Sequence, residues 1–287
     1  MIKPLIGIVV VLLISLPLAL AGSQASVSNG SLPLFFLCAS VGFILHWLMF
    51  IPAYIYQTEH YFDLTGSLSY IAAISMAIIS HPGLDLRGTI IALFILIWAA
   101  RLGSFLFMRV KRDGKDSRFD VIKTKFFRYL FTWTLGGAWV FITMAAGLAA
   151  ITSAIQIKIG IVFYLGAALW LSGFAVEVVA DRQKSIFRSN PDNKSKFISS
   201  GLWSVSRHPN YFGEIVLWIG ISVMAFPALS GWQFATLISP IFVIFLLIKV
   251  SGVRLLEESG QERWGENEDY RKYVERTPVL IPAIRRR

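Results

Sequence analysis

Apolar residues fill eight long stretches of the chain, and short polar segments separate them. The stretches cover residues 4 to 21, 33 to 56, 66 to 80, 89 to 110, 129 to 151, 158 to 180, 212 to 228 and 232 to 253. A helix needs about 20 apolar residues to cross about 30 Å of hydrocarbon, and the third and seventh stretches are short. The pattern predicts an all-α fold, a polytopic membrane helical bundle with seven or eight transmembrane helices.

The first stretch has two interpretations. Lys3, an apolar centre and the small residues Ala19 and Ala21 before Gly22 are also typical of a signal peptide with its cleavage site. We favour retention as an uncleaved anchor, and removal would leave the topology of the rest unchanged. Residues 1–32 are therefore expected to form an N-terminal anchor or signal-like segment with its loop, and residues 33–287 the main membrane domain.

The composition supports a membrane protein and excludes two kinds of site. Charged residues make up 15% of the chain and hydrophobic residues 55%, whereas soluble domains are roughly 25% charged. The single cysteine, Cys38, excludes an intrachain disulfide and a cysteine-cluster metal site. The four histidines lie far apart without metal-ligand spacing, so we expect no metal.

The net charge of +10 is concentrated in loops rather than on one face of a soluble domain, so we expect no nucleic-acid partner. With eight spans, the basic segments 109 to 128, 182 to 207 and 254 to 287 fall on one side of the membrane. The loops on the other side are short and poor in charge: 22 to 32, 81 to 88, 152 to 158 and 228 to 231. The positive-inside rule makes the basic side cytoplasmic.

Three segments on that side carry candidate chemistry. The loop Gln57 to Gly66 crowds Glu59, His60, Tyr61 and Asp63 together. An acid in a poorly solvated site can donate a proton near neutral pH, although a solvated loop explains the same residues about equally well. The second segment, Gly114 to Asp120, lies in a basic stretch that suits lipid headgroups or nucleotide phosphates; Arg112 and Arg118 are its phosphate candidates.

The third segment, Gly201 to Glu214, is the densest polar stretch beside a span. It holds Arg207, His208, Asn210, Tyr211 and Glu214. Polar groups at a membrane surface are costly unless they hold something. We therefore expect these side chains to bind a charged cofactor.

Two pairs of residues four apart share a helix face: Glu177 with Asp181, and Arg254 with Glu258. An intramembrane Glu favours a partner or ligand, whereas the second pair is equally well explained as a surface ion pair. No dinucleotide-binding or P-loop glycine motif occurs, so helices and loops must hold any cofactor. Glycine spacings such as Gly160 to Gly166 are too loose to count as a GxxxG motif, and small residues in spans are more often packing positions.

Four blocks of the sequence resemble the membrane steroid 5α-reductase family, and most closely its bacterial DUF1295-type members. They are QTEHYFDLTGSLSY (57 to 70), WAARLGSFLFMRVKRDGKDSRFD (98 to 120), GLWSVSRHPNYFGEIVLWIG (201 to 220) and WGENEDYRKYVERTPVLIP (264 to 282). The last two blocks are also similar to isoprenylcysteine carboxyl methyltransferases and related membrane methyltransferases. The first two favour the reductase, which makes residues 33–287 a reductase-like catalytic domain.

The resemblance implies NADPH-dependent reduction of a carbon–carbon double bond conjugated to a ketone, as in a 3-oxo-Δ4 steroid or a similar lipid enone. It implies that Gln57 and Glu59 contact the ketone oxygen, although Thr58 separates residues that are adjacent in relatives. Tyr61 and Asp63 are the alternative acids in this loop. Trp98 matches a family Tyr that also contacts the carbonyl; Trp can donate a hydrogen bond but cannot supply a proton. For NADPH it implies Asp181, Arg188, Asn210, Glu214 and Arg254, with Glu258 and Tyr273 at similar spacing.

Two other functions fit parts of the sequence. A methyltransferase that uses S-adenosylmethionine would share the C-terminal half, and a non-catalytic sterol or lipid binder would need neither cofactor. Paired halves and paired broken helices typical of transporters are not detectable. The expected partners are a lipophilic substrate and membrane lipids, and the expected location is the bacterial inner membrane with the cofactor site facing the cytoplasm.

Overall fold

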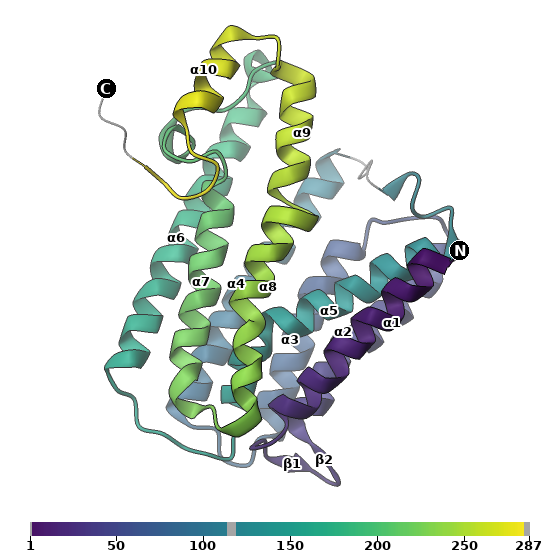
Figure 1. Cartoon of the computed structure of the whole chain (residues 1–287), viewed down its shortest axis with the longest axis vertical. Coiled ribbons are helices and arrows are strands. Elements are labelled where there is room, and N and C mark those ends of the chain that lie inside the picture. Colours follow the sequence, from purple (N-terminus) through teal and green to yellow (C-terminus); the bar gives the residue numbers. More distant parts are fainter. Residues whose placement is uncertain (1, 114–118, 284–287) are drawn as a thin grey trace. The chain divides into compact units, whose positions relative to one another are not determined.

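The computed structural model describes residues 2–113 and 119–283, and most of these residues lie in helices (Figure 1). Eight of its helices are long and apolar enough to cross a membrane, so the predicted polytopic all-α membrane protein is confirmed. The chain divides into two compact units. Unit 1 comprises residues 1–164 and 222–239, and unit 2 comprises residues 165–221 and 240–287.

Unit 1 is built around α5, Phe126–Ile151, on which α1, α2, α3 and α4 pack. These four helices span Ile2–Gly22, Leu34–Ile55, Phe62–Ser80 and Leu86–Asp113. α5 is apolar on all sides and rich in Gly and Ala, as expected for a helix surrounded by others. The strands β1, Ser28–Asn29, and β2, Leu32–Pro33, form a small antiparallel hairpin between α1 and α2. Two short 3-10 helices, η4 (Phe226–Ala228) and η5 (Gly231–Leu237), complete the unit.

A buried arginine joins three segments at one end of unit 1. Arg87, in the first turn of α4, is 2% exposed. Its guanidinium donates to the carbonyl oxygens of Met224 at 2.6 Å and Lys158 at 3.1 Å, and it lies over the Phe163 ring. The hydrogen bonds offset the cost of burying the charge, so Arg87 ties α4 to the last turn of α7 and to the loop before α6.

Unit 2 consists of most of α6 (Ile161–Ser189), most of α7 (Pro209–Ala225), most of α8 (Ile238–Phe245), α9 (Val253–Trp264) and α10 (Glu268–Arg276). A π-helical turn, η6 (Leu246–Val250), connects α8 to α9 along one path (Figure 1). Two 3-10 turns, η2 (Pro191–Asn193) and η3 (Gly201–Ser204), lie between α6 and α7. Asn267 caps α10 by accepting hydrogen bonds from Asp269 N and Tyr270 N.

Paired glycines bring α6 and α7 into close contact. A Cβ added to Gly173 would lie 2.6 Å from Gly213 O, and one added to Gly220 would lie 2.6 Å from Gly166 O. The two glycines on each helix are seven residues apart, which is about two turns. Each helix therefore lacks side chains at two positions on the face that contacts the other helix. The expectation that small residues in the spans are packing positions is confirmed for Gly166, whose close contact lies on another helix.

Candidate functional site

The segment Val205 to His208 is held in place by the C-terminal tail of the chain. The Arg207 amide donates to Pro278 O at 2.9 Å, Ser206 Oγ donates to Leu280 O at 2.8 Å, and the Ala283 amide donates to Val205 O at 3.1 Å. Before this segment, Gly201 adopts a φ of 62°, which a residue without Cβ tolerates. These contacts fix the backbone of the Arg-His-Pro motif independently of its side chains.

Glu257 of α9 contacts the two charged or titratable side chains of that motif. Its Oε2 lies 2.5 Å from Arg207 Nη1, and its Oε1 lies 2.8 Å from His208 Nε2. Arg207 and His208 are largely buried, at 12% and 5% side-chain exposure. Burial lowers the pKa of His208 below its usual value, although Glu257 acts in the opposite direction.

These residues line a pocket of about 130 Å³ within unit 2. Its described lining is strongly basic and aromatic, with Glu257 as its carboxylate. The cations are Lys184, Arg188, Lys196, Arg207 and Arg263, and the rings are Phe187, Phe197, Trp203, Trp264, Tyr270 and Tyr273. Such a lining suits phosphate groups and a stacked base. The volume accommodates one end of a dinucleotide and not the whole molecule.

Two aromatic residues of the pocket lining, Tyr273 and Trp203, are held by hydrogen bonds to backbone carbonyl groups of unit 2. Tyr273 donates to Trp203 O at 2.8 Å, and Trp203 Nε1 donates to Ala180 O at 3.1 Å. The Lys184 ammonium lies 4.6 Å from the centre of the Trp203 ring. Burial raises the pKa of Tyr273, so its hydroxyl stays protonated and keeps its bond to Trp203.

The pocket brings together only some of the cofactor residues expected from the sequence. Arg188, Arg207, His208 and Tyr273 line it. Arg254 and Glu258 instead form a loose pair on the exposed face of α9, at 3.8 Å with about 60% of each side chain accessible.

The remaining expected residues on α6 and α7 lie outside the described lining of that pocket. Asp181 and Glu177 are buried on α6, at 6% and 2% exposure. Asn210 and Glu214 lie in the first two turns of α7, and Tyr211 stacks on the His208 ring with 10° between the planes. Of the two phosphate candidates in the basic stretch, Arg112 lies in the last turn of α4 and its side chain is not described, and Arg118 lies outside the described residues.

Sequence reasoning missed most of the pocket lining, including the charged residues Lys184, Lys196, Glu257 and Arg263. Glu257 directly precedes Glu258, which was selected because it lies four residues after Arg254. The sequence did contain a signal for Glu257. A buried arginine next to a histidine needs a carboxylate partner, and the consecutive residues Glu257 and Glu258 were both candidates.

The residues expected at the substrate carbonyl belong to unit 1. Glu59 is 4% exposed, and Lys123 Nζ donates to its Oε2 at 2.7 Å. Gln57 is exposed, has a φ of 51° and donates through Nε2 to Tyr54 O at 2.6 Å. Trp98 is fully buried in α4, with its ring edge-on to Tyr70.

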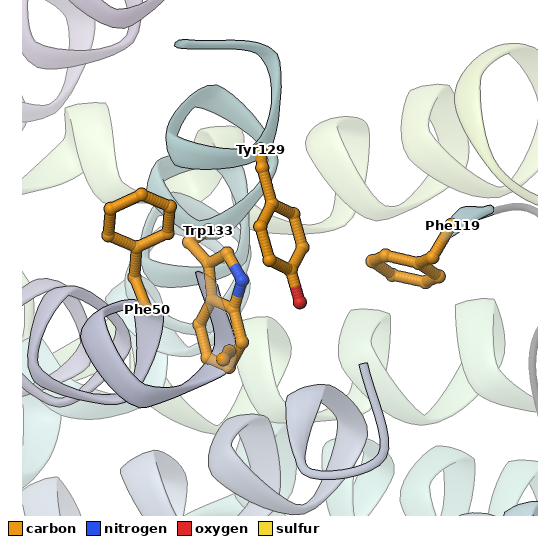
Figure 2. Close-up of a cluster of buried hydrophobic side chains, with 5 residues drawn as sticks. Phe50, Phe119, Tyr129 and Trp133 are labelled. Carbon is orange, nitrogen blue, oxygen red and sulfur yellow. The ribbon is translucent and has the colours of Figure 1, made fainter. Parts of the chain in front are cut away.

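An aromatic cluster lies beside this loop. Figure 2 shows Phe50 of α2, Tyr129 and Trp133 of α5, and Phe119 from the segment before α5 gathered together. Tyr129 donates to Thr58 O at 2.6 Å, which ties the cluster to the residue preceding Glu59. The loop is therefore anchored from both sides, by Lys123 and by Tyr129.

Comparisons with known proteins bear on what these sites do. The family model described as "Protein of unknown function (DUF1295)" matches residues 49–277. The chain belongs to the DUF1295 family. The match covers the first three sequence blocks and all but the last five residues of the fourth. Together with curated relatives named as steroid 5α-reductases, it confirms the predicted relation to that group.

One such relative is a protein named "3-oxo-5-alpha-steroid 4-dehydrogenase 1" from Rattus norvegicus, 29% identical over 42% of each chain. Another is named "Delta(14)-sterol reductase", from Ascobolus immersus, 31% identical over 41% of this chain and 29% of that protein. A third is named "Probable O-methyltransferase ustE", from Ustilaginoidea virens, 30% identical over 24% of this chain and 25% of that protein. Each match spans less than half of the relative. No solved structure matches the chain.

Proposed function

We propose that this DUF1295 member is an NADPH-dependent oxidoreductase that reduces the conjugated carbon–carbon double bond of a 3-oxo-Δ4 steroid or a similar lipid enone. The similarity to a steroid dehydrogenase and a sterol reductase supports the reaction class. The single observation that carries the proposal is the basic, aromatic pocket of unit 2, built on the Arg-His-Pro motif.

The residues of that pocket fit the phosphate and ribose end of NADPH. Among the described residues, Arg207 Nε and His208 Nδ1 are buried without a hydrogen-bond partner, so one donor and one ring nitrogen remain for a ligand. Arg188, Lys196 and Arg263 add positive charge for phosphates, and Tyr273 offers a ring face. The proposed cofactor set also includes Asp181, Asn210, Tyr211, Glu214, Arg254, Glu258, Arg112 and Arg118.

When bound, NADPH supplies a hydride from nicotinamide C4 to the β-carbon of the enone. The chain's own task is to stabilise negative charge on the ketone oxygen and to deliver a proton to the α-carbon, directly or through water. We assign the first task to Gln57, Glu59 and Trp98. Lys123 joins this set, because its ammonium 2.7 Å from Glu59 can return a proton to that carboxylate, and only the protonated acid donates to the ketone oxygen.

The proposed setting is the bacterial inner membrane, with the cofactor residues on the cytoplasmic side and the substrate drawn from the lipid phase. Eight apolar helices support membrane integration, and the basic loops support the orientation. The lipophilic substrate and membrane lipids are the expected partners.

A methyltransferase that uses S-adenosylmethionine is the second candidate, supported by the similarity to an O-methyltransferase. Titration of the purified protein in detergent with each cofactor discriminates the two. Saturable binding of NADPH and not of S-adenosylmethionine, followed by NADPH oxidation with a 3-oxo-Δ4 steroid, is the expected result. Binding of S-adenosylmethionine alone would replace the proposal, and binding of neither would indicate a non-catalytic lipid binder.

A further inference from the structure

One carboxylate in unit 2 holds two neighbouring side chains of the Arg-His-Pro motif at once. Glu257 accepts from Arg207 through Oε2 and from His208 through Oε1. It comes from α9, about 50 residues further along the chain. The backbone of the motif is already fixed by the C-terminal tail, so Glu257 acts on the side chains themselves.

The contact with Glu257 determines which His208 nitrogen carries the proton. An ionised carboxylate accepts hydrogen bonds and donates none, so His208 Nε2 must carry the proton. In a neutral ring Nδ1 is then a bare acceptor, and Nδ1 is buried without a hydrogen-bond partner among the described residues. The stacked Tyr211 ring fixes the orientation of the imidazole plane.

The charges around His208 favour a neutral ring near pH 7. Lys184 of α6 and Arg207 disfavour the imidazolium ion, and burial disfavours it further. Glu257 favours the imidazolium ion, but the balance leaves the His208 pKa below its usual value. Tyr211, which faces the ring from α7, carries no charge near neutral pH.

We propose that Glu257 is a positioning residue of the cofactor pocket. It holds Arg207 as a donor to an anionic group, and it holds His208 as an acceptor for an N–H or O–H group of the same ligand, such as a ribose hydroxyl or the amino group of a base. The second half of this assignment rests on the proposed NADPH function, whereas the state of His208 can be tested without any ligand.

The first test determines which ring nitrogen of His208 carries the proton. It uses nitrogen NMR on the full-length protein in detergent, after ¹⁵N-histidine labelling. His208→Asn identifies the His208 signals among the four histidines. We expect protonated Nε2 and bare Nδ1 at about pH 7. Glu257→Gln should shift the ring toward the other tautomer, since an amide can donate to Nε2, while Glu262→Gln on the same helix should leave it unchanged. A parent ring protonated on Nδ1, or a ring unaffected by Glu257→Gln, overturns the proposal.

The second test is NADPH affinity as a function of pH for the same variants. Glu257→Gln should weaken binding about 10- to 100-fold, by analogy with the loss of residues that orient the ligands of a metal ion. Parent affinity should fall on acidification below the usual histidine range, as Nδ1 becomes protonated. Glu262→Gln, at an exposed position of α9 outside the pocket lining, should follow the parent. Parent-like affinity and pH profile in folded Glu257→Gln refute the positioning role. If the parent itself binds no NADPH, the proposed function fails while the NMR test still decides the histidine assignment.

Discussion

At the scale of single residues, a side chain's partners decide which of its atoms remain for a ligand. Arg207 Nη1 donates to the Glu257 carboxylate, and the Arg207 backbone amide donates to Pro278 O. Its Nε is buried without a partner among the described residues. A guanidinium can serve a protein carboxylate and a ligand anion together, because its donors point in fixed, separate directions. An ammonium group offers no such fork.

Arg207→Lys should therefore weaken NADPH binding about 10- to 100-fold, the equivalent of one or two charge-assisted hydrogen bonds. The positive charge is conserved, so a loss of affinity isolates the geometry of the fork. Isothermal titration or fluorescence quenching in detergent measures it. Arg182→Lys, on an exposed position of α6, is the matched control. Equal affinity in both variants would remove Arg207 from the cofactor site.

Glu59 is the residue on which the proposed chemistry of unit 1 depends. Glu59→Ala should slow single-turnover NADPH oxidation with a 3-oxo-Δ4 steroid by about 10² to 10³, the usual effect of losing one group that stabilises an oxyanion. Glu59→Gln should lose less, because an amide still donates a hydrogen bond. Lys123→Met tests the ion pair, and a rate as low as that of Glu59→Ala is expected if the two act together. If Glu59→Ala oxidises NADPH at the parent rate, Glu59 has no part in the reaction and only holds its loop in place.

At the scale of elements, close helix packing sets the position of the polar ends of α6 and α7. Gly173 and Gly213 face each other, one turn before Glu177 on α6 and beside Glu214 on α7. Backbones that approach this closely leave no room for a methyl group between them. The glycine pairs thus hold the acid-bearing turns of the two helices at a fixed separation.

Gly173→Ala should lower stability by about 1–3 kcal/mol, because the new Cβ would lie 2.6 Å from backbone atoms that cannot move aside. Thermal unfolding in detergent, followed by loss of the monodisperse peak on size exclusion, measures the change. Gly160→Ala is the control, since an added Cβ there meets nothing within 4 Å. Equal melting temperatures for the two variants would show that α6 and α7 can move apart without a loss of stability.

At the scale of the whole molecule, the distribution of charge sets the orientation in the membrane. Single cysteines at Lys194 and Gly83, both exposed, report the two sides in a background where Cys38 is replaced by alanine. We expect Lys194→Cys to react with a membrane-impermeant thiol reagent only from the cytoplasm, and Gly83→Cys only from outside. Labelling of both from one side would overturn the topology.

The sequence by itself determined the class of protein, the spans and the family blocks. A run of about 20 apolar residues crosses lipid as a helix, because a helix satisfies its own backbone hydrogen bonds where water is absent. Length and hydropathy are local properties, so the eight spans were recoverable without any knowledge of packing. Arg188, Arg207, His208 and Tyr273 were likewise selected from their motifs and do line one pocket.

Only the tertiary structure decided which residues meet across different helices. One position along a helix turns the side chain by about 100°, so the neighbours Glu257 and Glu258 face different surroundings, and spacing from Arg254 led to the exposed one. The pairing of Gly166 with Gly220 depends on the register of two antiparallel helices, which no local pattern contains. The ion pair of Lys123 with Glu59 likewise joins residues 64 positions apart, and packing alone brings them together.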